Sequence, residues 1–342
     1  MKSEDTPTVG VKAFANLALV KYWGKQDSLR NLPATPSIGI NLQELFVETE
    51  LQAADGGVGA EQAPAGEPDL TVEVNGELQP PERYASFMQS LKERSGYRGR
   101  LHARSRSSFP AGAGLASSAA GFAALATGGA ELAERAGGRN LSEQERSAIA
   151  RVGSGSAARA VIGGFSLFPA GAEHAEQIAA ASAWPELRVV VATVTTAAKS
   201  LSSRRAMEST RESSPYYRAW LADAELLKDE ALRAIEGRDL EALGEVIRAS
   251  YLRMHATMLA ARPPIRYWLP VSVQVLEICD ELRRNGVAAY ETMDAGPQVK
   301  IITTTVDKDR VKEALLRLPL ATAPVVSRIA DAPEIHVPGD AE

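Results

Sequence analysis

The segment from Phe109 to Ala120 constrains the fold of this chain more than any other part of the sequence. A run of proline, alanine and glycine, Pro110–Gly114, leads directly into an alanine-rich stretch, Leu115–Ala136, with high helix propensity. Small residues let a backbone wrap closely around an anion, and the free N–H groups of a helix N-terminus attract negative charge. Ser117 and Ser118 add hydroxyls for a phosphate oxygen or for magnesium. No Gly-Lys-Ser/Thr follows the glycines, so this is not a Walker A loop, and a helix start built for close packing is the alternative.

A second loop of this kind follows shortly afterwards. Ser142 and Glu145 have the spacing of a capping box, which predicts a helix that ends near Val152. The Gly/Ser loop Gly153–Ser156 comes next, and Arg159 follows it. An arginine so placed can bind a carboxylate or phosphate through two parallel hydrogen bonds. Taken alone, this stretch is explained better by a flexible turn followed by a solvated arginine.

Asp294 is the third candidate, in the turn Met293–Pro297 between two apolar strands. Aspartate is common before glycine and proline, so it serves there either as a turn former or as a rigidly held base or orienting acceptor. Its position alone favours the turn.

Hydrophobic periodicity predicts the α+β class. Strands are expected at 11–19, 45–51, 70–74, 187–194, 287–292 and 299–305, with a hairpin turn at Asn75-Gly76. Helices are expected at 220–235, 239–254 and 271–286 and after Asp307. Residues 53–68, rich in alanine, glycine, glutamate and proline, are expected to form a surface excursion. Helices packed on antiparallel strands are typical of α+β rather than doubly wound proteins.

Composition excludes several classes of partner. The 342 residues suit two closely packed domains, and the net charge of −5 argues against a surface for nucleic acid or an anionic membrane. Cys279 is the single cysteine, which excludes disulfides within the chain and favours the cytoplasm. A hydrophobic leader and long apolar runs are absent, so export and membrane contact are not expected. The four histidines lie too far apart in the sequence for a zinc site.

Seven segments, in this order, resemble the mevalonate diphosphate decarboxylase family of the GHMP kinase superfamily. They are Lys21–Lys25 with Asn31–Pro33, Phe109–Ala120, Gly153–Arg159 with Gly163–Phe165, Ser202–Met207, Met254–Thr257, Pro263–Pro264 and Met293–Pro297. The resemblance implies the two-domain GHMP kinase fold. A ribosomal protein S5 domain 2-like ATP-binding domain would span 1–186 and a ferredoxin-like domain 187–342, with the active site in the cleft between them.

Carried over position by position, the resemblance also implies roles. Asp294 would lie beside the 3-hydroxyl of the substrate as base or orienting group, Lys21 would neutralise charge at the reacting centre, and Arg159 would hold the substrate carboxylate. The implied substrate-binding residues are Tyr22, Lys25, Ser203 and Arg204 at the 5-phosphates, with Ser154 and Ser156. The implied ATP-binding residues are Gly112, Gly114, Leu115, Ala116, Ser117 and Ser118, with Ser117 or Ser118 as a magnesium ligand.

The reaction implied by the resemblance is the ATP-dependent decarboxylation of mevalonate 5-diphosphate to isopentenyl diphosphate, in isoprenoid biosynthesis. Phosphorylation turns the tertiary alcohol into a leaving group, and positioning and electrostatics supply most of the catalysis. One alternative is the phosphomevalonate decarboxylase branch, which would act on the monophosphate. A kinase that stops at 3-phosphorylation is another, and the retention of Arg159 together with Asp294 argues against it. A non-catalytic protein of this fold is the last, and the retention of Asp294, Lys21 and the pair Ser117-Ser118 argues against it. The resemblance further suggests a homodimer.

Some positions depart from the family pattern near the substrate loops. Thr35–Ser37 stands where Asn-Ser-Ser or Asn-Asn-Ser is usual, Ala206 replaces a glycine and Gln298 replaces an asparagine. Trp268 follows Tyr267 in place of the usual pattern. None of these changes removes a proposed catalytic group, but they leave the number of substrate phosphates open.

Overall fold

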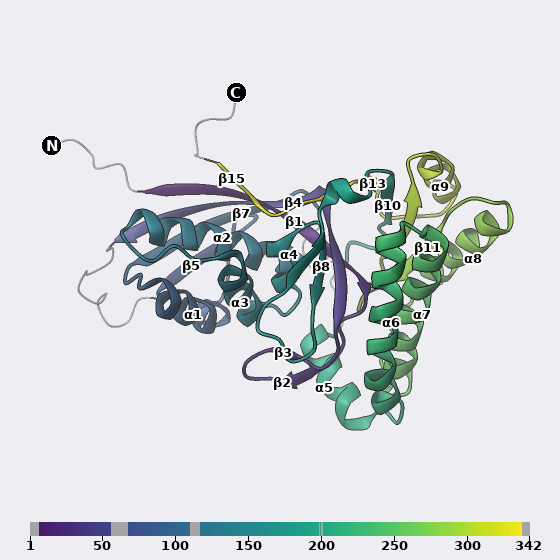
Figure 1. Ribbon diagram of the computed structural model, residues 1–342, viewed down its shortest axis with the longest axis horizontal. Coiled ribbons are helices and arrows are strands. Elements are labelled where there is room, and N and C mark those ends of the chain that lie inside the picture. The colour runs from purple at the N-terminus through teal and green to yellow at the C-terminus, as the bar shows by residue number, and fades with distance from the viewer. Residues whose placement is uncertain (1–6, 56–67, 110–116, 198, 200, 337–342) are drawn as a thin grey trace.

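The computed structural model describes residues 7–55, 68–109, 117–197, 199 and 201–336 (Figure 1). Within these ranges, two main sheets and their helices form the α+β fold that the periodicity predicts. Figure 1 shows the first sheet with α1–α4 on the left and the helices α6–α9 on the right. No helix in the described part of the chain is long and apolar enough to cross a membrane.

The first sheet is built around two long antiparallel strands, β1 and β4, with Val9 opposite Leu51. Its order is β15-β1-β4-β7-β5-β6, and β8 and β14 also pair with β4, while β9 pairs with β8. The strands are β1 (Thr8–Val20), β4 (Ser37–Asp55), β5 (Leu70–Val74), β6 (Glu77–Leu78), β7 (Arg100–Ser107), β8 (Phe165–Phe168), β9 (Glu176–Ala179), β14 (Ile329–Ala330) and β15 (Glu334–His336). A small separate hairpin, β2 (Lys25–Asp27) with β3 (Leu32–Pro33), follows β1.

Four helices pack with this sheet, and α2 lies directly on β1 and β4. They are α1 (Ala85–Ser95), α2 (Ser117–Arg135), α3 (Glu143–Gly153) and α4 (Ala157–Ile162), with short 3₁₀ turns at Pro81–Arg83 and Ala181–Ala183. The small residues of α2 permit its close approach to the sheet, because a Cβ at Gly128 would lie 2.6 Å from the Leu51 side chain. The capping box of Ser142 and Glu145 is confirmed at the start of α3.

The second sheet is antiparallel, with the order β11-β12-β10-β13. Its strands are β10 (Leu187–Ala192), β11 (Tyr290–Met293), β12 (Val299–Thr304) and β13 (Val325–Ser327). The helices of this half are α5 (Ser203–Ser213), α6 (Tyr217–Gly237), α7 (Leu240–Leu259), α8 (Pro270–Arg284) and α9 (Lys308–Leu315). The α6 stripe predicted from Trp220 to Ile235 is buried, and so is Cys279 on α8.

The two halves share hydrophobic contacts and strands. One buried cluster joins Leu17 and Ile40 of the first sheet to Val189 and Ile302 of the second and to Ile247 of α7. After β13 the chain returns to the first sheet, where β14 pairs with β4 and β15 pairs with β1. The division at residues 186 and 187 stays a prediction.

Most predicted elements are present with altered ends. The strand expected at 45–51 is the centre of β4, which begins at Ser37, and the helix expected to end at 254 continues to Leu259. The strand expected at 287 begins at Tyr290. The first part of β4 escaped prediction because residues 37–42 are buried on both faces, including the polar Asn41, and so show no alternation. The loop 110–114 and most of 53–68 lie outside the described residues.

Candidate active site

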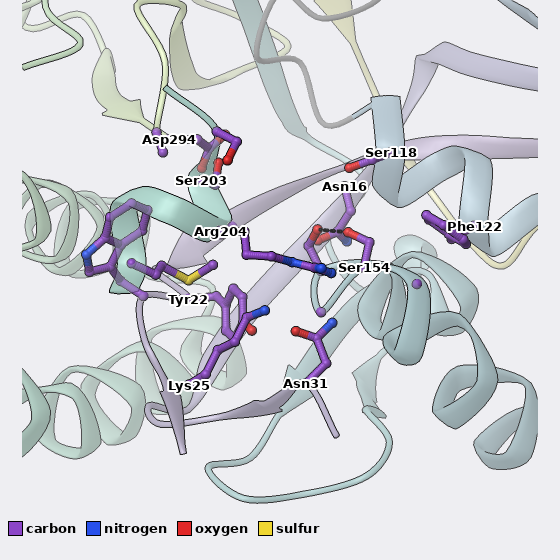
Figure 2. Close-up of a pocket in the computed structure, with 18 of the residues that line it drawn as sticks. Asn16, Tyr22, Lys25, Asn31, Ser118, Phe122, Ser154, Ser203, Arg204 and Asp294 are labelled. Atoms are coloured by element: carbon purple, nitrogen blue, oxygen red, sulfur yellow. Dashed lines mark hydrogen bonds between the residues drawn. The ribbon is translucent and has the colours of Figure 1, made fainter. Parts of the chain in front are cut away.

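A cavity of about 650 Å³ lies where the end of β1, the β2–β3 hairpin, the start of α2, the loop between α3 and α4, the start of α5 and the turn after β11 meet (Figure 2). Six of its lining side chains are cationic and two are acidic, although the whole chain carries a net charge of −5. The cationic residues are Lys21, Lys25, Arg83, Arg159, Lys199 and Arg204. Such a concentration of positive charge in an acidic protein favours a ligand with several negative charges.

Asp294 and Lys21 form an ion pair in the cavity wall. Lys21 follows the last residue of β1, and its Nζ donates to Asp294 Oδ1 at 2.8 Å and to the Ala18 carbonyl at 2.7 Å. Lys300 of β12 donates to the other carboxylate oxygen, Oδ2, at 2.9 Å. Burial alone would raise the pKa of Asp294, but attraction to the two ammonium groups outweighs it and holds this pKa well below its usual range. Asp294 is therefore a carboxylate at neutral pH.

Arg159 is fixed by a chain of buried amides. Its Nε donates to Asn16 Oδ1 at 3.0 Å, and its Nη1 donates to Ser37 Oγ at 2.5 Å. Asn16 Nδ2 donates to Asn41 Oδ1 at 3.0 Å, and Asn41 Nδ2 donates to the carbonyls of Ala160 and Asp331 at 3.0 and 3.1 Å.

Because both donors of the Asn41 amide are used, the orientation of each amide in this chain is determined. Among the described residues, nothing accepts a hydrogen bond from Nη2 of Arg159, which lines the cavity. This edge of the guanidinium is free for an anionic group of a ligand.

A second group of cationic and polar residues lies at the β2–β3 hairpin. Figure 2 shows Tyr22, Lys25 and Asn31 on one side of the cavity, with Arg204 reaching from α5 toward Ser154. Burial raises the pKa of Tyr22 to about 12, so its hydroxyl keeps its proton. Within the described ranges, this hydroxyl is buried and has no hydrogen-bond partner. Burial, with nearby Arg204, lowers the pKa of Lys25 to about 8.

The small-residue loop after α3 allows this group to form. A Cβ at Gly155 would lie 2.6 Å from Tyr22 Oη, so only glycine lets the loop pass at this distance. Ser154 and Ser156 face the cavity, with their hydroxyls 3.4 Å apart. At the start of α5, Ser203 Oγ accepts from Lys199 Nζ at 2.7 Å. This places hydroxyl and ammonium donors along the length of the cavity.

The predicted nucleotide loop is represented by its last part. Ser117 and Ser118, in the first turn of α2, line the cavity, whereas Gly112, Gly114, Leu115 and Ala116 lie outside the described residues. A helix N-terminus with two hydroxyls suits phosphate. Among the described residues, no group of three or more histidine, cysteine, aspartate or glutamate side chains could hold a metal ion. Magnesium prefers a few protein oxygens together with substrate phosphates, so serine hydroxyls at this helix start fit that chemistry.

The structure thus brings Asp294, Lys21 and Arg159 into one cavity with the described residues predicted to bind substrate and ATP. Sequence reasoning missed Lys300, Lys199 and Asn16. Lys300 had a readable signal, because a lysine inside the apolar strand Val299–Thr304 requires an anionic partner. Lys199 and Asn16 carried no such signal.

Two family models match the chain. Diphosphomevalonate decarboxylase-like N-terminal domain matches residues 13–179, and Mevalonate 5-diphosphate decarboxylase C-terminal domain matches residues 189–335. The diphosphomevalonate decarboxylase of Candida albicans is 32% identical over 91% of this chain and 88% of its own length. That of Saccharomyces cerevisiae is 33% identical over 85% of this chain and 76% of its own.

Solved structures are similar along nearly the whole chain. Mevalonate diphosphate decarboxylase from Staphylococcus aureus has a TM-score of 0.87 at 32% identity and covers 98% of this chain and 99% of its own. A complex of MDDEF with MVAPP, AMPPCP and magnesium has a TM-score of 0.84 at 31% identity and covers 96% and 98%. A structure on mevalonate diphosphate mediated ATP binding by the Enterococcus faecalis enzyme has a TM-score of 0.83 at 30% identity and covers 96% and 98%.

Proposed function

Since the chain belongs to the diphosphomevalonate decarboxylase family, we infer that it converts mevalonate 5-diphosphate and ATP into isopentenyl diphosphate, ADP, phosphate and carbon dioxide. The observation that carries this inference is the meeting of Asp294, Lys21 and Arg159 with a row of phosphate-binding donors in one cationic cavity. A decarboxylase of this kind has to hold a hydroxyl, a carboxylate and phosphates at once, and the cavity has separate donors and acceptors for each.

We assign the reacting end to Asp294, Lys21 and Arg159. Asp294 would accept a hydrogen bond from the 3-hydroxyl, and Lys21 would offset the negative charge that gathers there during phosphoryl transfer. The free edge of Arg159 would bind the substrate carboxylate, as a planar guanidinium does well. Holding the carboxylate beside carbon 3 keeps it in line to leave as carbon dioxide once the phosphate departs.

We assign the other end to the substrate phosphates. Tyr22, Lys25 and Arg204 offer one hydroxyl and two cationic donors, and Ser154, Ser156 and Ser203 add neutral hydroxyls. Three strong donors at this end favour two phosphates over one, in agreement with the names of the relatives. The monophosphate reaction is the second candidate, supported by the departures at Thr35–Ser37.

ATP and magnesium are proposed as the second substrate and the metal. ATP supplies the phosphoryl group that activates the 3-hydroxyl. Ser117 and Ser118 at the start of α2 would bind its phosphates, one of them through magnesium. The complex of the related MDDEF with AMPPCP and magnesium supports this assignment.

Three wider properties are also proposed. The separate matches at 13–179 and 189–335 support two domains that divide near residue 187. The family resemblance supports a homodimer, which light scattering on the purified protein would test. A single buried cysteine, Cys279, supports a cytoplasmic location.

Turnover assays test the function. The purified protein is given ATP and magnesium with mevalonate, its 5-phosphate or its 5-diphosphate, and ADP and carbon dioxide are followed together. We expect both products from the diphosphate. Carbon dioxide from the monophosphate alone would select the second candidate, and ADP without carbon dioxide would make the protein a 3-kinase. The absence of both products with all three compounds would refute the assignment.

A further inference from the structure

The Asp294 carboxylate has a buried ammonium group on each oxygen. Lys21 Nζ lies 2.8 Å from Oδ1, and Lys300 Nζ lies 2.9 Å from Oδ2. The side chains of Lys21 and Lys300 are 1% and 4% exposed, whereas that of Asp294 is 27% exposed and lines the cavity. The carboxylate therefore reaches the cavity with a buried ammonium group on each oxygen, and of these two lysines Lys21 also lines the cavity.

Packing of the strand does not explain Lys300. It lies in β12 between Val299 and Ile301, which are both fully buried, and opposite Val191 and Thr292 on the neighbouring strands. An ammonium group buried at such a position costs free energy, which an apolar residue of similar length would avoid. Lys300 is not among the described residues that line the cavity, so its route to the ligand runs through Asp294.

The other charged or titratable groups near Asp294 have partners of their own. Lys199 donates to Ser203 Oγ and to the Ala295 carbonyl, and Arg159 donates to Asn16 and Ser37. His255 Nδ1 accepts from Trp268 Nε1 at 2.9 Å, and burial lowers the His255 pKa to about 3, so this ring is neutral. Within the described part of the chain, Lys21 and Lys300 are the two side chains that contact the carboxylate directly.

We propose that Lys300 is a positioning residue that keeps Asp294 as a hydrogen-bond acceptor for the substrate hydroxyl and prevents it from taking the hydroxyl proton. This inference rests on the proposed function. Each carboxylate oxygen has a lone pair left beyond its bond to lysine, so it can still orient the hydroxyl. Protonation of Asp294 would sacrifice attraction to two buried cations at once, which makes it a poor proton acceptor.

The step balances without a protein base. A bond forms between oxygen 3 of the substrate and the γ-phosphorus as the bond from that phosphorus to the β-phosphate oxygen breaks, and ADP leaves with the electron pair. The hydroxyl proton passes to an oxygen of the transferred phosphoryl group. In a loose transition state the hydroxyl needs orientation more than deprotonation, which agrees with this order.

A titration without substrate tests the hold of Lys300 on Asp294. The ¹³C shifts of labelled aspartate carboxyl groups are followed against pH in the full chain, and the Asp294→Asn variant identifies the signal. We expect the Asp294 midpoint in Lys300→Met to lie at least about one pH unit above that of the wild type, since one cation is lost. Lys300→Arg keeps the cation and should titrate as the wild type does. An unchanged midpoint in Lys300→Met, or an equal shift in Lys300→Arg, would overturn the proposal.

Kinetics test the fate of the proton. With ATP and mevalonate 5-diphosphate, we expect kcat of Lys300→Met to be at least about tenfold lower at every pH, because a less firmly held carboxylate orients the hydroxyl poorly. The KM for mevalonate 5-diphosphate should change less than about threefold, because Lys300 is not among the described residues that line the cavity. If Asp294 were the base, Lys300→Met would be as fast as the wild type or faster once the pH exceeds the raised midpoint, and this result would refute the proposal.

Thr303→Val provides the matched control. Thr303 is fully buried on the same strand, and its hydroxyl donates to the Ala288 carbonyl, away from Asp294. Thr303→Val should lower the melting temperature without changing the titration midpoint of Asp294 or kcat. If Thr303→Val and Lys300→Met changed the midpoint and kcat equally, the role of Lys300 would be structural only. If the wild type releases no carbon dioxide from mevalonate or either of its phosphates, the proposed function is wrong, and so is the proposed role of Asp294 at the substrate hydroxyl. The titration is independent of that result, because it measures only whether Lys300 lowers the pKa of Asp294.

Discussion

At the scale of single residues, Tyr22 shows how binding and stability compete in this cavity. Its hydroxyl is buried, keeps its proton and has no partner among the described residues. An unpaired buried hydroxyl costs about 1–3 kcal/mol of folding free energy, which a phosphate oxygen would recover on binding. The residue is therefore better explained by a ligand than by the fold.

Tyr22→Phe should accordingly change stability and affinity in opposite directions. We expect the free energy of unfolding to rise by up to about 1 kcal/mol and the KM for mevalonate 5-diphosphate to rise about tenfold. Urea unfolding and steady-state kinetics measure the two quantities. Tyr267→Phe is the control, because the Tyr267 hydroxyl donates to the Leu201 carbonyl at 3.0 Å, so its loss should lower stability and leave KM unchanged. A Tyr22→Phe protein that is less stable than the wild type would contradict this account.

Loss of the proton from Lys25 should lower kcat/KM for mevalonate 5-diphosphate at high pH. Burial and nearby Arg204 lower its pKa to about 8, so the ammonium is complete below that pH and is lost as the pH rises through it. Since kcat/KM reports groups of the free enzyme, we expect kcat/KM for mevalonate 5-diphosphate to fall above about pH 8. Lys25→Arg keeps its charge there and should move the limb to higher pH. A limb that stays in place in this variant would belong to Lys21, whose pKa burial also lowers to about 8.

The success of sequence reasoning differed among these residues. Lys21, Arg159 and Asp294 could be placed by resemblance, although the position of Asp294 between strands favoured a simple turn. Its lysine partners come from opposite directions, one after β1 and one from β12. The contact with Lys300 lies within the β11–β12 hairpin, whereas the contact with Lys21 depends on how the two sheets pack, and spacing along the chain carries no information about that packing.

At the scale of elements, β4 connects the cavity to distant parts of the chain. Asn41 of β4 is fully buried and accepts a hydrogen bond from Asn16. Asn16 in turn accepts a hydrogen bond from Arg159, so the orientation of Asn41 fixes that of Arg159. The same amide is anchored by carbonyls of α4 and of the segment that precedes β15. The orientation of Arg159 on α4 thus depends on β1, on β4 and on the segment that precedes β15.

Asn41→Asp tests this chain of amides with an isosteric change. The new carboxylate would face two carbonyls that need donors, so Asn16 would lose its fixed orientation and Arg159 its partner. We expect kcat to fall about tenfold and the KM for ATP to change less than about twofold. Asn285→Asp, which removes an exposed donor to the Glu281 carbonyl, should leave both constants unchanged. A loss of kcat no larger than the unfolded fraction would indicate a purely structural role for Asn41.

Helices and strands could be predicted from the sequence where their polar and apolar residues form a clear pattern. The half-buried stripe of α6 and the capping box of α3 were readable because one face is polar or one cap is specific. The first residues of β4 could not be predicted, because a strand that is buried on both faces shows no alternation of polar and apolar residues. The pairing of β14 and β15 could not be predicted either, because strands of two or three residues are too short to show a pattern. Long-range pairing decides those elements.

At the scale of the whole molecule, the charge of the cavity opposes that of the chain. Six cationic and two acidic residues line the cavity within a protein of net charge −5. The screening length is about 10 Å at 0.1 M salt, so a ligand in the cavity responds mainly to the lining residues and little to the distant acidic surface.

Added salt should therefore weaken capture of substrate. We expect kcat/KM for mevalonate 5-diphosphate to fall several-fold between about 0.05 M and about 0.5 M potassium chloride, with kcat nearly constant. Lys12→Gln, on β1 with its ammonium over the Phe46 ring, removes a positive charge that does not line the cavity and should keep the same dependence. A rise of kcat/KM with salt would mean that the acidic surface controls approach.

The return of residues 329–336 to the first sheet has a consequence for synthesis on the ribosome. β14 and β15 are translated after the other described elements, yet they pair with β4 and β1, which are among the first. The carbonyl of Asp331 in the same segment completes the anchoring of Asn41, and through it the aim of Arg159. In a nascent chain, the β1 edge at Gly10–Lys12 and the short stretch Asn41–Leu42 of β4 therefore lack these partners until translation has passed this segment. The anchoring of Asn41, and with it the orientation of Arg159, is completed only after residue 331 has been translated, so we expect a product cut short before residue 329 to lack both the edge strand of the first sheet and a firmly held Arg159.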